Sequence, residues 1–186
     1  MTEGSSLLTD SEFRRAVLDI TTSAFRAERQ PSYFEEPEEE LRRAFLRGDA
    51  EPPADIPFFQ GWYDQIQEHV RAGRRIGRVR IHSDPLSEYQ RYERWLGIWN
   101  ERAGEQILYL TRERAGELGL LDDTQTDWWL LDADQDSQRV IVMTFDAEGR
   151  RISNEVVTDP VAVQEATAWR DLAVHHAAPD HRINAA

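Results

Sequence analysis

The sequence contains no cysteine and no lysine, and each absence excludes a class of chemistry. Without cysteine there can be no disulfide, no thiolate metal site and no cysteine nucleophile. Without lysine there can be no Schiff-base enzyme and no phosphate-binding loop of the lysine-containing type. All 22 cationic side chains are therefore arginines, a composition typical of a GC-rich genome.

The sequence also lacks a long apolar run and a basic surface. No stretch is long and apolar enough to span a bilayer, and residues 1–4 are not the start of a signal peptide, so we expect a cytoplasmic protein with no membrane contact. The formal net charge of −13 repels nucleic-acid phosphates, and the only dense basic stretch is 71–80. We therefore expect no direct binding to nucleic acid.

Sequence motifs for dinucleotide, phosphate, serine-hydrolase and zinc-protease sites are all missing. Three of the five histidines lie close together near the carboxyl end, and their spacing does not predict a convergent set of metal ligands. The sequence consequently predicts neither a metal site nor a cofactor.

Residues 74–112 form the central unit of the chain and predict a strand, a helix and a second strand. Val79 and Ile81 alternate with polar side chains, which is typical of a half-buried strand. Residues 83–85, Ser-Asp-Pro, suit the start of a helix, and the apolar run 107–110 indicates the second strand. Two strands joined by a helix of this length favour a parallel pair with a right-handed crossover.

The remaining segments predict one α/β domain over residues 10–176, with flexible tails at 1–9 and 177–186. Residues 24–29 suit a short strand on which Arg26 and Glu28 share one face. The three segments that predict an antiparallel meander are 127–132, 139–145 and 151–157. Together with flanking helices, these elements predict a mixed sheet of the α/β class, with α+β as the alternative.

Candidate ligand-binding residues gather where the first strand of the central unit ends. In open α/β sheets this crevice binds ligands, and the amino end of a helix favours anions. The alternative is that Arg26 and Arg80 form structural ion pairs with nearby carboxylates. The full set of candidates comprises Arg26, Arg80, His82, Ser83, Tyr89, Glu93, Trp129 and Asp132.

Several segments resemble an actinobacterial family catalogued as domain of unknown function six-eight-seven-nine. The residues that carry the resemblance are 24–28, 78–89, 127–132 and 145–160, and it extends over roughly residues 10–176. The resemblance implies a gene beside that of a helix-turn-helix regulator. The predicted layout also resembles half of a phospholipase D fold, whose catalysis uses a histidine and a lysine. A chain without lysine would be related to non-catalytic members of that group.

These observations favour a non-catalytic accessory or sensor domain that binds a small anionic ligand or a basic DNA-binding regulator. The acidic surface suits a basic partner, since opposite potentials steer association. An enzyme is the less favoured class. The enzyme that the sequence best supports is a hydrolase that pairs Glu93 with Asp127 or Asp132. A third alternative is a structural subunit, whose sign would be an exposed apolar patch at Trp95, Trp128 or Trp129.

Overall fold

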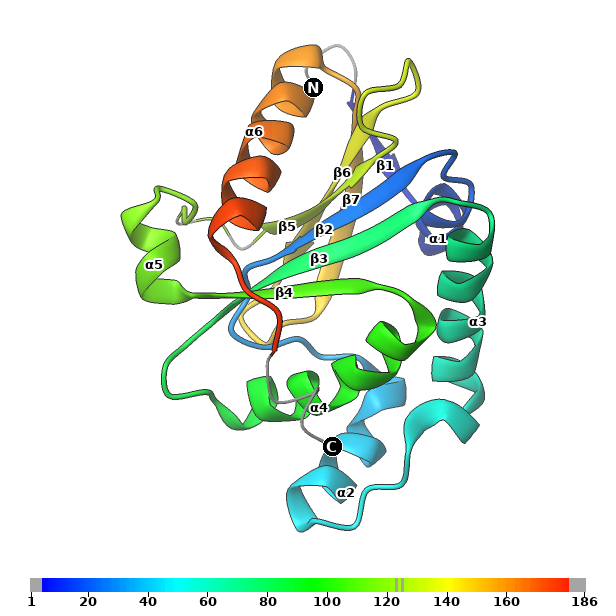
Figure 1. Ribbon diagram of the computed structural model, residues 1–186, viewed down its shortest axis with the longest axis vertical. Helices are drawn as coiled ribbons and strands as arrows, with labels where there is room; N and C mark the ends of the chain where they lie inside the picture. Colours follow the sequence, from blue (N-terminus) through cyan, green and yellow to red (C-terminus); the bar gives the residue numbers. More distant parts are fainter. Residues whose placement is uncertain (1–4, 123, 125, 181–186) are drawn as a thin grey trace.

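The strands of the chain form one mixed sheet of seven strands, in the order β1-β7-β6-β5-β2-β3-β4 (Figure 1). The computed structural model describes residues 5–122, 124 and 126–180. The strands are β1 (Ser5–Leu8), β2 (Ser23–Glu28), β3 (Arg75–His82), β4 (Gln106–Thr111), β5 (Thr126–Leu131), β6 (Arg139–Phe145) and β7 (Arg151–Val157). Strands β2, β3 and β4 run parallel, and the other neighbours pair antiparallel. The predicted α/β mixed sheet with its antiparallel meander is confirmed.

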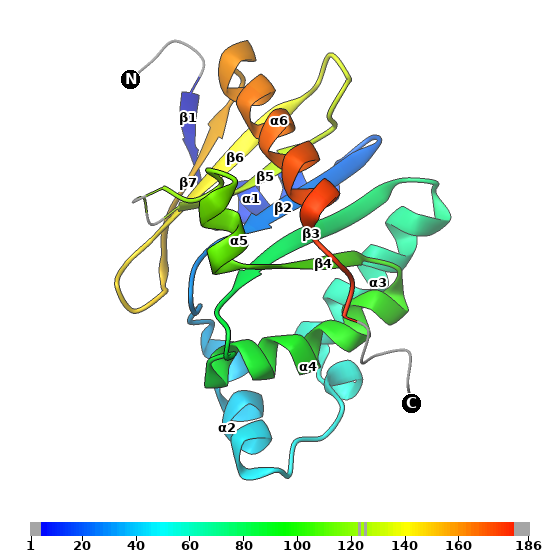
Figure 2. The same cartoon turned by 60° about the vertical axis from the view of Figure 1, so that its left-hand side comes forward.

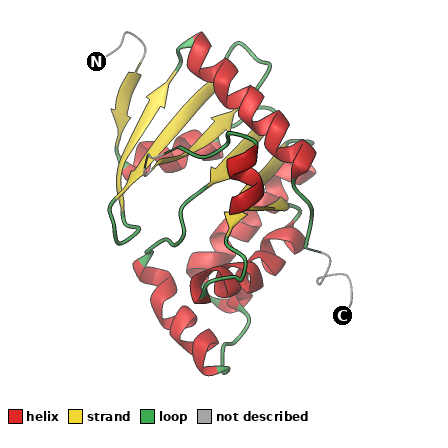
Figure 3. Cartoon of the chain, turned by 90° about the vertical axis from the view of Figure 1, so that its left-hand side faces the viewer, coloured by secondary structure: helices red, strands yellow, loops and turns green. Residues whose placement is uncertain are grey.

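Helices cover both faces of this sheet (Figures 1, 2 and 3). One face is covered by α6 (Pro160–His176) and the short α5 (Arg112–Glu117). The other is covered by α1 (Asp10–Leu18), α3 (Pro57–Arg71) and α4 (Glu88–Ala103). The connection between β2 and α3 contains η1 (Glu36–Glu38), α2 (Glu39–Arg47) and η2 (Pro53–Asp55). Helix α2 packs on α4 through Phe45, whose ring contacts Tyr92 and Trp95.

Alternation along the strands decides which side chains face which helices. On β2, Ala24 packs into the core beneath α1 and α3, whereas Ala27 packs into the core beneath α6. Because side chains alternate between the two faces of a strand, Arg26 and Glu28 lie on the same face as Ala24. The α1, α3 and α4 face therefore carries charged side chains at the centre of the sheet.

The central unit folds as predicted, except for the start of its helix. Strands β3 and β4 are parallel and α4 connects them. The helix begins at Glu88, however, and its amino-terminal cap is Ser87, which forms a reciprocal capping box with Gln90. The expected cap at Ser83 or Asp84 is therefore wrong. The Ser87 hydroxyl, a capping glutamine three residues later and the left-handed Gly104 at the carboxyl end satisfy the terminal backbone groups of α4.

Both predicted tails are partly built into the fold. Ser5–Leu8 pairs with β7, and Ala178 forms a bridge with Tyr109 of β4. Residues 1–4 and 181–186 of the predicted tails lie outside the described residues. In the part of the chain that the structure describes, no helix is both long and apolar enough to cross a bilayer.

Candidate functional site

A cavity of about 390 Å³ lies between the charged face of the sheet and the helices α1, α3 and α4. The exposed Arg14, Leu18, Glu35 and Phe58 define its mouth. Its floor is buried and comes from the sheet, α3 and α4. The buried floor residues are Glu28, Phe59, Arg78, Arg80, Leu96, Asn100, Trp129, Met143 and Phe145. A volume of this size falls in the range of small-ligand sites.

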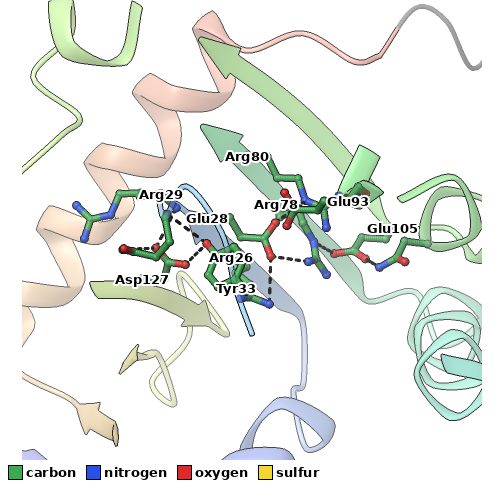
Figure 4. A network of polar contacts seen from close by, with 11 residues as sticks. Arg26, Glu28, Arg29, Tyr33, Arg78, Arg80, Glu93, Glu105 and Asp127 are labelled. Atoms are coloured by element: carbon green, nitrogen blue, oxygen red, sulfur yellow. Dashed lines mark hydrogen bonds and ion pairs between the residues drawn. The ribbon is translucent and has the colours of Figure 1, made fainter. Parts of the chain in front are cut away.

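Glu28 is the centre of an ion-pair network on the floor (Figure 4). Its Oε1 accepts from Nη1 of Arg78 at 2.8 Å and lies 3.1 Å from Nη1 of Arg26, and its Oε2 accepts from Nε of Arg80 at 2.5 Å. Burial by itself raises the pKa of this carboxyl, but the three guanidinium groups hold it well below its ordinary value. Glu28 is therefore ionised, and it satisfies one donor of each arginine.

The network continues toward α4 through Arg78 and Arg80. Nε of Arg78 donates to Oε1 of Glu105 at 2.6 Å, and the other oxygen of Glu105 accepts from the side-chain amide of Asn100 at 2.6 Å. Nη1 of Arg80 donates to the backbone carbonyl of Glu93 at 3.0 Å, and Nε of Arg80 lies 3.5 Å from the carboxylate of Glu93. Arg78 and Arg80 are consequently held in place from both sides.

On the opposite side of Glu28, Arg26 leads to a second polar group. Its guanidinium lies over the rings of Tyr33 and Trp129, at 5.4 Å and 5.7 Å from their centroids. The hydroxyl of Tyr33 donates to Oδ2 of Asp127, and the backbone N–H of Arg29 donates to Oδ1 at 2.9 Å. Burial raises the pKa of Asp127, although Arg26 and the Tyr33 hydroxyl oppose the rise. Figure 4 shows these groups in one row along the sheet.

Two further carboxyls lining the cavity have raised pKa values. Burial, together with Glu35 and Glu93 nearby, raises the pKa of Glu38 to about 7. Burial also raises the pKa of Glu93 to about 7, with Arg80 opposing the rise and Glu28 adding to it. Both groups therefore change charge near neutral pH, which changes the charge balance of the cavity.

Three buried N–H donors that line the cavity have no hydrogen-bond partner among the described residues. They are Nε of Arg26 on β2, Nε2 of Gln65 on α3 and Nε1 of Trp129 on β5. Buried polar groups in folded proteins are nearly always hydrogen-bonded, so unpaired donors at one cavity indicate a place for acceptor atoms. No acceptor among the described residues satisfies these three donors.

Five of the eight predicted candidates line this cavity: Arg26, Arg80, Tyr89, Glu93 and Trp129. The other three lie elsewhere. His82 contacts the backbone carbonyl of Ser83 through its ring, and Ser83 donates to Gln90 at 2.6 Å. Asp132 accepts from the backbone N–H groups of Thr21 and Thr22, at 2.7 Å and 2.8 Å, where it holds the segment that leads into β2.

The cavity does not coincide with the expected site at the end of the first strand of the central unit. It lies over the face of the sheet, and α4 lines it from Tyr89 in its first turn to Asn100. The alternative that Arg26 and Arg80 form ion pairs with carboxylates is also realised. Arg26 and Arg80 thus form ion pairs and also line the cavity.

Sequence reasoning missed Glu28, Arg78, Tyr33 and Glu38 as parts of the site. For the first two a signal was present, because Arg26 and Glu28 share a face of β2 and Arg78 shares a face with Arg80 on β3. Parallel pairing of these strands places Glu28 opposite Arg80. For Tyr33 and Glu38 there was no local signal, since they reach the cavity from the irregular segment after β2.

The structure also bears on the enzymatic and structural alternatives. Glu93 lines the cavity and Asp127 adjoins it through Tyr33, but Asp132 is not part of this lining. Of the three tryptophans expected in an exposed patch, Trp128 and Trp129 are buried, and Trp95 is half-buried with its ring against Phe45 and Trp99. Within residues 5–122, 124 and 126–180, no group of three or more histidine or acidic side chains is arranged to hold a metal ion.

Comparison with known families identifies the relationship of this chain. The model of the family described as "Domain of unknown function (DUF6879)" matches residues 11–182. The chain belongs to this family. A search of curated proteins gave no match. The match to the family spans strands β2 to β7 and every residue that lines the cavity, whereas β1 lies before it.

Proposed function

We propose that this member of the family is a non-catalytic cytoplasmic accessory or sensor domain whose cavity binds a small anionic ligand. The observation that carries the proposal is the set of unpaired donors at Arg26, Gln65 and Trp129. All three are N–H groups, so only acceptor atoms complete them. A ligand with carboxylate or similar oxygens would supply those atoms.

The charge of the lining supports an anion as the ligand. Five arginines and four glutamates line the cavity, whereas the whole chain has a formal charge of −13. Two of those glutamates, Glu38 and Glu93, have pKa values raised to about 7 and lose charge below neutral pH. The cavity is therefore a region of positive balance within an acidic protein, and this balance increases on mild acidification.

Thermal melting with a panel of anions tests this function. The panel contains acetate, citrate, sulfate, a sugar phosphate and a nucleotide, each compared with sodium chloride at equal ionic strength. A ligand that binds only the folded state raises the melting temperature in a concentration-dependent way. Absence of any shift across the panel and across organic monocarboxylates would remove the proposal.

A hydrolase with paired carboxylates remains the second candidate, and the raised pKa of Glu93 supports it. A carboxyl with a pKa of about 7 suits a general acid at neutral pH. Nuclear magnetic resonance of a bound ligand after prolonged incubation distinguishes the two functions. Unchanged ligand supports a binding domain, and conversion that is lost in Glu93→Gln supports a hydrolase.

The partner in this proposal is a basic DNA-binding regulator of the helix-turn-helix type, encoded near this gene. The net charge of −13 supports it, because an acidic surface steers a basic protein. We further propose an actinobacterial origin and a relationship to non-catalytic phospholipase D-like domains; the lack of lysine supports the non-catalytic character. Purified regulator and this protein should associate at low salt and dissociate as ionic strength rises, and no association at low salt would exclude this partner.

A further inference from the structure

The side of the cavity formed by α1 and α3 is largely apolar, whereas β2 and β3 on the opposite side contribute charged side chains. Phe13 and Leu18 on α1 and Phe58 and Trp62 on α3 line the apolar side. Leu18 and Phe58 each leave 42% of their surface exposed. By contrast, Trp129 on the floor is 3% exposed. A ligand that fills this cavity contacts apolar side chains of α1 and α3 on one side and charged side chains of the sheet on the other.

The polar floor has little positive charge to spare. Arg26, Arg78 and Arg80 each pair with Glu28, and Arg78 also pairs with Glu105. Glu93 lies 3.5 Å from Arg80 and adds a further carboxyl. A ligand with two negative charges would be repelled by these carboxylates, because like charges repel strongly where water is excluded. A ligand with a single negative charge suits the balance of arginines and carboxylates on the floor better.

The available donors also suit a carboxylate. Arg26, Gln65 and Trp129 each offer one unpaired N–H, from β2, α3 and β5 respectively. A carboxylate accepts several hydrogen bonds through its two oxygens. None of the three donors belongs to an arginine face that is free for bidentate phosphate binding, since the guanidinium of Arg26 already pairs with Glu28.

We propose that the ligand is a monocarboxylic acid with an apolar body, either aromatic or aliphatic. Its carboxylate lies on the floor near Arg26 and Trp129, and its body lies between α1 and α3 against Leu18, Phe58 and Trp62. The cavity of about 390 Å³ admits an acid of modest size, such as a phenylalkanoate or a medium-chain fatty acid. This assignment rests on the proposed function, because it specifies the anion that the same cavity binds.

Calorimetric titration of the full chain near pH 6 with five probes tests the assignment. The probes are 3-phenylpropanoate, hexanoate, acetate, sulfate and the neutral amide 3-phenylpropanamide. We expect the two acids with apolar bodies to bind roughly tenfold or more tighter than acetate, because their bodies are removed from water. Tighter binding of sulfate would overturn the assignment and leave the anion-binding function intact. Equal binding of the amide would overturn the anion itself. No binding of any probe would overturn the assignment, and the wider panel of citrate, sugar phosphate and nucleotide would then decide the anion-binding function.

Two variants test where the carboxylate and the apolar body of the ligand bind. Trp129→Phe removes one floor donor and should weaken binding of hexanoate and acetate alike by about fivefold to tenfold. Phe58→Ser, at the exposed mouth, should weaken 3-phenylpropanoate and leave acetate unchanged. Trp169→Phe is the matched control, because its Nε1 donates to the carbonyl of Leu120 at 3.0 Å on the other face of the sheet. An unchanged affinity for 3-phenylpropanoate in Phe58→Ser contradicts the placement of the body.

A measurement on the unmodified protein removes any dependence on how the variants fold. The indole N–H resonance of Trp129 should shift when 3-phenylpropanoate is added, because this donor gains an acceptor. The indole resonance of Trp169 should stay in place, since that donor is already paired. A shift at Trp169 without a shift at Trp129 would place the acid elsewhere and overturn the assignment.

Discussion

Arg80 and Glu28 are directly opposite each other on adjacent parallel strands, and Nε of Arg80 lies 2.5 Å from Oε2 of Glu28. The pair is thus a consequence of sheet register. Arg80 is 6% exposed and also donates to the backbone carbonyl of Glu93, so its position is determined by the fold. In the proposed binding mode, a ligand lies beside Arg80 and accepts hydrogen bonds from donors that have no partner in the described chain.

Removal of Arg80 should be strongly destabilising. Arg80→Ala leaves two buried carboxyls with one cation fewer, and we expect the free energy of unfolding to fall by about 3–5 kcal/mol. Arg80→Lys keeps the charge but loses the planar fork, so it should cost less. Arg43→Ala is the control, because this arginine is 62% exposed in its side chain and lies 3.7 Å from Glu39. Denaturant unfolding measures all three, and equal midpoints for Arg80→Ala and Arg43→Ala would contradict a structural role.

The stability of the protein should fall as the pH rises through neutrality because of Glu93. Its pKa is raised from 4.5 to about 7 in the folded state, so the folded state holds a proton that the unfolded state releases. This contribution to stability is complete below the pKa of Glu93 in the unfolded state. It is lost as the pH rises through the pKa of Glu93 in the folded state. The slope reaches up to about 1.4 kcal/mol per pH unit for one such group.

The variant Glu93→Gln isolates this effect. Its unfolding free energy between about pH 5 and pH 8 should depend less on pH than that of the wild type, since amides do not titrate. Glu40→Gln serves as the control, because the side chain of Glu40 is 78% exposed. Parallel curves for wild type and Glu93→Gln, measured by denaturant titration at each pH, would refute the assignment of Glu93.

Gly97 should not tolerate a methyl group. A Cβ at this position of α4 would lie 3.1 Å from Nη1 of Arg80 and 3.3 Å from the hydroxyl of Tyr109. Arg80 cannot move away without breaking its contacts with Glu28, so Gly97→Ala should cost about 1–3 kcal/mol despite the better helix propensity of alanine.

Gly61 provides the matched comparison for Gly97. It lies inside α3, and a Cβ there meets nothing within 4 Å. Gly61→Ala should therefore raise the free energy of unfolding by about 0.5–1 kcal/mol through helix propensity alone. Thermal and denaturant unfolding of the two variants should shift in opposite directions, and a gain in both would show that Arg80 is free to move.

Asp132 should matter for stability and not for ligand binding. Burial acts against its ionisation, but backbone N–H groups of Thr22, Thr21 and Ser23 lower its pKa below the ordinary value. Asp132→Ala leaves these donors without their acceptor and should cost on the order of 2 kcal/mol. Asp132→Asn should cost less, because asparagine keeps one acceptor and tolerates the φ of 51° at this position.

The pH dependence of Asp132 has the opposite sign to that of Glu93. Because the folded state lowers the pKa of Asp132, this group stabilises the folded protein at pH values above its pKa in the unfolded state. The contribution is lost as the pH falls through its pKa in the folded state. Affinity for 3-phenylpropanoate should be the same in Asp132→Asn and wild type, since Asp132 is not among the cavity residues. A large loss of affinity would show that the segment leading into β2 shapes the cavity.

The elements with strong local patterns could be predicted. The alternation around Val79 and Ile81 indicated β3, because burial of a strand surface selects every second residue. The pattern around Arg26 and Glu28 indicated β2. The sequence also contained the signal for the start of α4, since Ser87 and Gln90 have the spacing of a capping box. The proline at position 85, however, suggested an earlier start.

Elements that depend on distant pairing could not be predicted in the same way. Ser5–Leu8 is short and largely exposed, and it is a strand only because β7 offers an edge. Ala178 and Asp180 are likewise held by contacts with Tyr109 and Arg94. No local periodicity marks such segments, because their stability comes from hydrogen bonds and ion pairs with residues far along the chain.

By itself, the sequence determined the class of the fold, the strand-helix-strand unit and the chemistry that is excluded, because these follow from local periodicity and composition. Only the tertiary structure decided where the candidate site lies and which of its groups remain available. Arg80 and Glu28 are 52 residues apart, and the charge of one is offset by the other only once β2 and β3 pair. The sequence suggested a site at a free arginine at the end of a strand. Because Arg80 is paired with Glu28, the candidate site in the structure consists instead of unpaired donors over the face of the sheet.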